Sequence, residues 1–238
     1  IAPRPLLLIH ADGTDASTVF TDASSYARTI TAVGNVQIDT AQKQFGTASA
    51  LFDGAGDYLT VPDSADWAFG SGDFTVDFWV RFNSTVLGRT LCGQNTDANN
   101  GWRFYARGDN GNLQFDLSTG GSYTLQFTGT ISWTAATWHH VALVKNGTTW
   151  TMYVDGTSVG SATDVDTIQN YTGTLNIGYE GLSGGYMNGW FDEFRVSNVA
   201  RWTANFTPPA SAYAILPDNM TLVTTTQTSD ATVSNGRV

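Results

Sequence analysis

Apolar and polar side chains alternate along much of the chain with a period of two residues, not the 3.6 of a helix. Residues 74–82 give the clearest example: every second side chain from Phe74 to Phe82 is apolar, and Thr75, Asp77 and Arg81 stand between them. Successive side chains of a β-strand point to opposite faces of its sheet. The segment therefore predicts a half-buried strand whose apolar face belongs to the core of a sandwich.

Short segments of the same kind recur from one end of the chain to the other, and turn residues separate them. Asp109–Asn112 and Asn146–Gly147 are typical of tight hairpin turns. No stretch of useful length has helical periodicity. The further strands are expected at 6–10, 48–52, 58–61, 102–106, 113–117, 123–127, 139–145, 150–154, 175–179 and 190–197. This pattern predicts an all-β fold, a two-sheet antiparallel jelly-roll sandwich.

The composition of the chain changes at Pro208–Pro209. Beyond this point the sequence is rich in Ser, Thr, Ala and Asn and poor in aromatic residues. We therefore expect one domain over residues 1–207, followed by a linker and the start of another segment over 208–238. A short strand is expected at 220–224 within that segment.

The net negative charge of the chain restricts the classes of molecule that it is expected to bind. Asp and Glu number 21 against 11 Lys and Arg, which gives a formal net charge of −10. Nucleic acids and anionic membrane surfaces both require a cationic face, so neither is expected as a partner. No run of about 18 apolar residues is present, so insertion into a membrane is not expected either. Cys92 is the single cysteine, which excludes a disulfide within the chain.

Several motifs, taken in order, resemble the laminin-G-like or pentraxin-like concanavalin A jelly roll. They occupy residues 45–54, 57–62, 73–80, 138–144, 152–156 and 190–197, and the resemblance extends over about residues 6 to 207. The opening strand and the segment after Pro208 are also similar to proteins of bacteriophage particles, which are often tail, fibre or head-appendage components.

The resemblance implies a non-catalytic module that binds or builds at a virion surface or outside the cell. Glycan or host-surface recognition is the first expectation. A purely architectural domain that decorates a virion or docks to neighbouring subunits is the alternative, and a homo-oligomer fits either function. Fold alone does not decide between these functions.

Catalysis is the third and weakest hypothesis, and the chain is not expected to be an enzyme. Glycosidases on this fold need two carboxylates that flank the scissile bond. The two glutamates, Glu180 and Glu193, lie in no such motif, and Asp164 and Asp166 lie in a turn-like stretch. His139 and His140 are adjacent on a predicted strand, so their side chains should point to opposite faces and form no catalytic pair.

A structural Ca²⁺ site is expected at Asp12 and Asp192, with Asp53 as a weaker third ligand. The resemblance makes the first and last strands antiparallel neighbours, which would bring Asp12 close to Asp192. In residues 190–196, alternation places Asp192 on the face of Phe194 and Val196. Two carboxylates at close range favour a bound cation. The alternative is that Asp12 and Asp53 cap turns and that Asp192 pairs with Arg195 or Arg28.

Exposed aromatic rings and amides are the groups that would bind a glycan, because rings stack on sugars and amides bind hydroxyl groups. Any single one of these residues is more commonly part of a core. The candidates for ligand binding are Trp102, Tyr105, Tyr123, Tyr186, Asn99 and Asn100.

Overall fold

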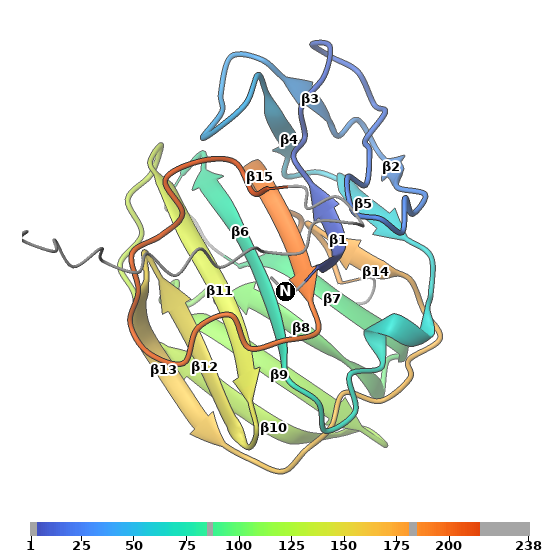
Figure 1. The fold of residues 1–238 in the computed structure, drawn as a ribbon, viewed down its shortest axis with the longest axis vertical. Helices are drawn as coiled ribbons and strands as arrows, with labels where there is room; N and C mark the ends of the chain where they lie inside the picture. Colours follow the sequence, from blue (N-terminus) through green and yellow to red (C-terminus); the bar gives the residue numbers. More distant parts are fainter. Residues whose placement is uncertain (1–3, 85–87, 181–184, 215–238) are drawn as a thin grey trace, which may run out of the picture.

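The computed structural model describes residues 4–84, 88–180 and 185–214 and folds them into two antiparallel sheets packed face to face (Figure 1). The eight-stranded sheet runs β13 (Thr157–Thr163), β12 (Thr149–Val154), β11 (Trp138–Asn146), β6 (Phe74–Phe82), β15 (Asn188–Ser197), β4 (Ser49–Asp53) and β3 (Gln37–Asp39), and β1 (Pro5–Ile9) also pairs with β15. The seven-stranded sheet runs β10 (Ser122–Gly129), β9 (Leu113–Thr119), β8 (Asn100–Ala106), β7 (Arg89–Asp97), β14 (Leu175–Ile177), β5 (Tyr58–Val61) and β2 (Thr31–Val33).

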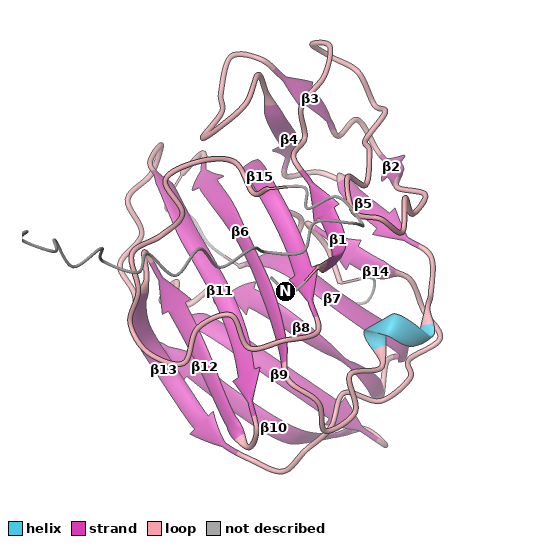
Figure 2. Ribbon diagram, viewed as in Figure 1, coloured by secondary structure: helices cyan, strands magenta, loops and turns pink. Residues whose placement is uncertain are grey.

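The all-β jelly-roll sandwich expected from the alternating pattern is thus confirmed. The helix in the described residues is a single 3-10 turn, η1 (Ala65–Trp67), drawn in cyan in Figure 2. No helix in this part of the chain is long and apolar enough to cross a membrane. The expected strand at 220–224 lies outside the described residues.

The core fills the space between the two sheets. Alternate residues of β6 from Phe74 to Phe82 are buried there, as the pattern predicts. Phe78 stacks on Phe194 at 5.4 Å and meets Phe191 and Phe104 edge-on, which joins β6 and β15 to β8 of the other sheet. Each fully buried ring contributes about 1.5–3 kcal/mol through the hydrophobic effect. This aromatic cluster holds the sheets in register.

A β-bulge divides β15 and lets two strands share one of its edges. The regular register breaks between Asp192 and Arg195, where Glu193 has a φ of 54°. Before the bulge β15 pairs with β4, and after it β15 pairs with β1. The expected antiparallel pairing of the first and last strands is confirmed. The bulge also shifts the alternation, so Asp192 is in register with Trp79 and not on the core face of Phe194 and Val196, as the sequence pattern predicted.

The outer face of the eight-stranded sheet is covered by residues 198–213, which cross it after β15 (Figure 1). Trp202 stacks on Phe206 at 3.9 Å, and Phe206 packs against Tyr153 of β12. Beneath this segment Asp77 is fully buried and accepts two hydrogen bonds from Arg195, at 3.0 and 2.8 Å. The expected half-buried strand is therefore buried on both faces, because a segment distant in sequence covers its polar side.

Packing continues past the expected domain boundary at residue 207. Tyr213 is 5% exposed, its hydroxyl lies 3.0 Å from Nε2 of His140, and its backbone N–H donates to Glu193. The Arg195 guanidinium lies 3.6 Å from the centroid of the Tyr213 ring. The outer face of the seven-stranded sheet carries no comparable cover within the described residues, and a hollow lies on it.

Candidate functional site

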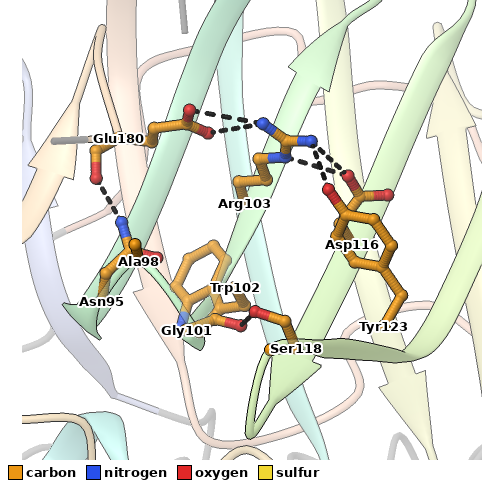
Figure 3. Close-up of a pocket in the computed structure, with 10 residues that line it drawn as sticks. Asn95, Ala98, Gly101, Trp102, Arg103, Asp116, Ser118, Tyr123 and Glu180 are labelled. Carbon is orange, nitrogen blue, oxygen red and sulfur yellow. Dashed lines mark hydrogen bonds and ion pairs between the residues drawn. The ribbon is translucent and has the colours of Figure 1, made fainter. Parts of the chain in front are cut away.

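An open hollow of about 310 Å³ lies on the outer face of the seven-stranded sheet, over β7, β8 and β9 (Figure 3). Its walls combine amide, hydroxyl, carboxylate, guanidinium and aromatic groups. The lining residues are Asn95, Ala98, Gly101, Trp102, Arg103, Asp116, Ser118, Gly121, Tyr123 and Glu180. Ligand sites are typically concave and carry a few convergent polar groups, so this hollow is the first candidate.

Strand alternation places the charged groups of the hollow. On β8, Trp102 and Phe104 belong to the core, so Arg103 between them faces outward. On β9, Phe115 and Leu117 belong to the core, so Asp116 also faces outward. Arg103 and Asp116 are directly opposite each other in the β8–β9 register. Cross-strand partners on one face lie close enough for their side chains to interact.

Arg103 is the centre of the polar network. Its Nε and Nη2 lie 2.9 and 2.8 Å from Oδ2 of Asp116, and its Nη1 donates to both carboxylate oxygens of Glu180 at 3.3 and 3.4 Å. Nη2 also donates to the Tyr123 hydroxyl at 3.0 Å. Burial of the guanidinium opposes its charge, but the negative charges of Glu180 and Asp116 outweigh this and raise the pKa of Arg103. The guanidinium is therefore fixed between two carboxylates (Figure 3).

Asp116 is 1% exposed although it lies on an outer face. Its Oδ1 accepts from the side-chain amides of Gln114, at 2.6 Å, and Gln126, at 2.8 Å, and its Oδ2 accepts from the Tyr105 hydroxyl at 3.1 Å. Burial raises the pKa of Tyr105, and the charge of Asp116 raises it further. The hydroxyl therefore stays protonated and remains a donor. A buried charge with this many partners is rigid, which gives the hollow a firm floor.

The wall at β7 depends on Gly101. A Cβ at this position would lie 2.0 Å from Oδ1 of Asn95, so a larger residue would displace the Asn95 side chain. The Asn95 amide donates to the backbone carbonyl of Glu180. This contact holds residue 180 over the sheet, where its carboxylate meets Arg103.

The six predicted ligand-binding residues divide between the hollow, its surroundings and a separate cluster. Tyr123 is 57% exposed and stands at the rim. Trp102 lines the hollow but is only 4% exposed, and its ring lies in the core beside Phe115. Tyr105 lies beneath Arg103, whose guanidinium is 4.6 Å from the ring centroid.

The two predicted asparagines join the turns at one end of the hollow. The Asn99 carbonyl accepts from the backbone N–H of Gly121, and Oδ1 of Asn100 accepts from that of Gly120. They act there on the backbone and support the rim. Tyr186 is not at the hollow: it stacks on Tyr179 at 4.4 Å and packs against Tyr58 in a separate group of three tyrosines.

Asp12 and Asp192, the predicted Ca²⁺ ligands, both hold the loop at residues 44–48. Asp12 accepts from the backbone N–H groups of Thr47 and Ala48, and Oδ2 of Asp192 accepts from those of Gln44 and Phe45, at 2.8 and 3.0 Å. Burial raises the pKa of Asp192 to about 7, which the two backbone N–H donors oppose, while the charges of Glu193 and Asp12 raise it further. Asp12 therefore lies close enough to Asp192 for its negative charge to raise the pKa of Asp192.

Asp53 lies apart from this pair, near the other end of the β4–β15 pairing, and its carboxylate accepts from the N–H of Ala55 in its own turn. Arg195 pairs with Asp77 and Arg28 pairs with Asp66, so neither arginine is the partner of Asp192. Among the described residues, no three His, Cys, Asp or Glu side chains are arranged to hold a metal ion. Ca²⁺ also takes backbone carbonyls and water as ligands, so its binding at Asp12 and Asp192 stays a prediction.

Sequence reasoning missed Arg103, Asp116, Glu180 and Asn95, although they are four of the ten residues that line the hollow. A signal for two of them was available, because Arg103 and Asp116 each stand in the polar register of an alternating apolar strand. No pattern in the sequence indicated Glu180 and Asn95, because the contact between them depends on how residues 178–180 cross β7.

The sequence profile of the concanavalin A-like lectin/glucanases superfamily matches residues 53–205. That range contains every residue that lines the hollow. No curated protein sequence matches the chain.

Solved structures with the same fold include domain 4 of an extracellular arabinanase from Geobacillus stearothermophilus, in complex with arabinotriose. Its TM-score is 0.64, and the sequences are 16% identical over 83% of this chain and 94% of that domain. The binding domain of Paraclostridial Mosquitocidal Protein 1 has a TM-score of 0.64 and 18% identity over 83% of this chain. The receptor-binding domain of botulinum neurotoxin D has a TM-score of 0.61, with 18% identity over the same share. The chain spans about half the length of each toxin structure.

Proposed function

Because the chain belongs to the concanavalin A-like lectin/glucanases superfamily, we propose that the hollow on its seven-stranded sheet binds glycans reversibly and without catalysis. The observation that carries the proposal is the hollow itself, in which Arg103 fixes Asp116, Glu180 and Tyr123 by hydrogen bonds before any ligand arrives. A rigid set of donors and acceptors lowers the entropic cost of binding a flexible sugar.

The chemistry of the walls suits a sugar. Hydroxyl groups both donate and accept, so they can bind the amide and Ser118 hydroxyl groups of the walls alike. The Tyr123 ring is the exposed aromatic surface at the rim, and it can pack on the apolar face of a sugar ring. The arabinotriose bound to the arabinanase domain and the receptor-binding domains of the toxins support recognition of a glycan or receptor on this fold.

We propose that the protein works at an extracellular or virion surface and that it assembles there as a homo-oligomer. The extracellular arabinanase supports the first setting. The virion setting rests on the resemblance of the opening strand and of the segment after Pro208 to bacteriophage proteins. Docking to a neighbouring subunit at the same face is the alternative function.

Hydrolysis is the less favoured function. A glycosidase needs one carboxyl directed at the glycosidic oxygen and a second on the other side of the bond. The two carboxylates that line the hollow, those of Asp116 and Glu180, are instead directed at the Arg103 guanidinium.

The test is calorimetric titration with neutral oligosaccharides, arabinotriose first, against the intact chain and its Tyr123→Ala variant. Loss of the ring should weaken binding by about 0.5–1.5 kcal/mol, which is roughly two- to tenfold in Kd. Tyr26→Ala is the matched control, because Tyr26 is 47% exposed, also lies against an arginine and does not line the hollow. Equal affinities for the two variants would place the ligand elsewhere, and no binding by any glycan would overturn the proposal.

A further inference from the structure

A second hollow, of about 220 Å³, adjoins the first on the same face of the seven-stranded sheet. It lies where β7 ends and β14 begins. Its lining residues are Asn95, Thr96, Asp97, Gly173, Thr174, Asn176 and Glu180. Apart from Gly173, each of these carries a hydroxyl, amide or carboxylate group.

Asn95 and Glu180 line both hollows. The amide of Asn95 donates to the backbone carbonyl of Glu180 (Figure 3), so these two residues form a bridge between the two hollows. Gly173 brings the far wall close to this bridge, since a Cβ there would lie 1.8 Å from the carbonyl oxygen of Asn95. The two hollows are therefore neighbouring parts of one groove.

The charges of the groove are unbalanced. Among the residues that the structure describes, Asp116, Glu180 and Asp97 contribute three carboxylates, whereas Arg103 is the one cationic side chain that lines either hollow. The donors of Arg103 already meet Asp116 and Glu180. An anionic sugar would meet further negative charge while Arg103 is already paired with Asp116 and Glu180, which disfavours its binding. A neutral sugar meets no such repulsion and can bind the exposed Asp97 carboxylate and the hydroxyl and amide groups of the groove.

We propose that the two hollows bind successive units of one neutral glycan chain, so that the site recognises a stretch of the chain rather than a single terminal sugar. This inference rests on the proposed glycan-binding function and adds the class of ligand. On the far side of the bridge, Thr174 and Asn176 supply the polar contacts, and the Thr174 hydroxyl donates to Oδ1 of Asn176 at 2.7 Å.

The test is a series of neutral oligosaccharides from two to six units, arabino-, xylo- and gluco-oligosaccharides, titrated against the intact chain. For the series that binds, the affinity should rise at least fivefold between two and six units. Oligogalacturonides of the same lengths, which are anionic, should bind at least tenfold more weakly than that series.

A blocking variant identifies the second hollow as the origin of the length dependence. Thr174 is exposed, so Thr174→Tyr should fold normally and fill the second hollow with a ring. It should lower the affinity for six units to that for two and leave the affinity for two units unchanged. Thr157→Tyr, at an exposed position of β13 in the other sheet, is the matched control and should change neither affinity.

The outcomes separate the two proposals. Binding that does not depend on length, or a length dependence that Thr174→Tyr leaves intact, would overturn the two-hollow inference while the glycan-binding function stands. Tighter binding of oligogalacturonides would overturn the neutral class of ligand. No binding by any member of either series would overturn the glycan-binding function itself.

Discussion

Asp192 is a buried carboxyl that forms no ion pair within the described residues, although His10 lies near enough for the charge of Asp192 to raise the pKa of His10. The burial of Asp192 makes the stability of the protein depend on pH. Its Oδ2 accepts from two backbone N–H groups, but its Oδ1 is buried and has no hydrogen-bond partner in the described part of the chain. Burial raises its pKa from 3.8 to about 7 in the folded chain. Between about pH 4 and pH 7 the folded chain thus binds a proton that the unfolded chain does not, so the free energy of unfolding falls as the pH rises through this window.

We expect Asp192→Asn to remove this loss, because the amide oxygen can still accept from Gln44 and Phe45 but carries no charge. The gap in Tm between pH 5 and pH 8 should shrink by an amount that corresponds to a few kcal/mol. Thermal unfolding across this range measures it, with Asp53→Asn as the control at an exposed turn. An unchanged gap would contradict the role of Asp192. The same scans with Ca²⁺ or EDTA test the predicted ion, which would raise the Tm of the intact chain.

At the scale of elements, the segment 198–213 acts as a cover for the eight-stranded sheet. Trp202 and Phe206 stack on each other, and both rings meet the edge of His140 on β11. Thr75 and Asp77 of β6 are buried beneath it, and the Thr75 hydroxyl donates to the carbonyl of Val199. The buried Asp77–Arg195 pair is thus kept from water by side chains that follow it in the sequence.

Trp202→Ala should weaken this cover without affecting the hollow on the other sheet. We expect a loss of roughly 2–3 kcal/mol in the free energy of unfolding, below the usual cost for a fully buried Trp because this ring is only half-buried. Urea denaturation measures the change. Trp202→Phe keeps a ring on Phe206 and should recover most of the loss, and equal stabilities for Ala and Phe variants would contradict the stacking argument.

Local pattern predicts the strands that alternate but not the contacts that depend on distant parts of the chain. The core face of β6 follows directly from its sequence. The burial of its opposite, polar face depends on residues more than 120 positions later in the chain. β7 was not predicted, because its Thr, Gly, Gln and Asn residues do not alternate with apolar ones. In the site, the outward position of Arg103 could be predicted from the alternation of β8. The position of Glu180 could not, because it depends on how residues 178–180 cross β7.

At the scale of the whole molecule, the outer faces of the two sheets differ. Residues 198–213 cover the outer face of the eight-stranded sheet, whereas the outer face of the seven-stranded sheet carries the groove. The sheets also meet at one edge, where Thr130 of the segment after β10 donates to Val159 of β13. Gly160 fits against Gly129 there, because a Cβ at Gly160 would lie 2.7 Å from the Gly129 Cα. This contact protects two strand edges that would otherwise be free to pair with other chains.

Truncation tests how far the folded unit extends. A chain that ends at residue 207 lacks Tyr213 and its contacts with His140, Arg195 and Glu193, whereas a chain that ends at residue 214 keeps them. The shorter chain should unfold at a Tm several degrees lower, since about 1–2 kcal/mol of packing and hydrogen bonding is lost. Calorimetry of the two chains makes the comparison. Equal Tm values would place the boundary at 207, as the composition suggests.

The position of Tyr213 on the covered face has a practical consequence for attaching the protein to a sensor or bead. An anchor introduced just after residue 214 would sit behind the eight-stranded sheet and leave the groove facing the solution. Coupling through lysine amines would favour a similar orientation, because the chain has two lysines, of which Lys145 is buried and Lys43 is exposed next to the loop held by Asp192. Surface-bound formats should therefore allow the proposed glycan binding to be measured with little obstruction.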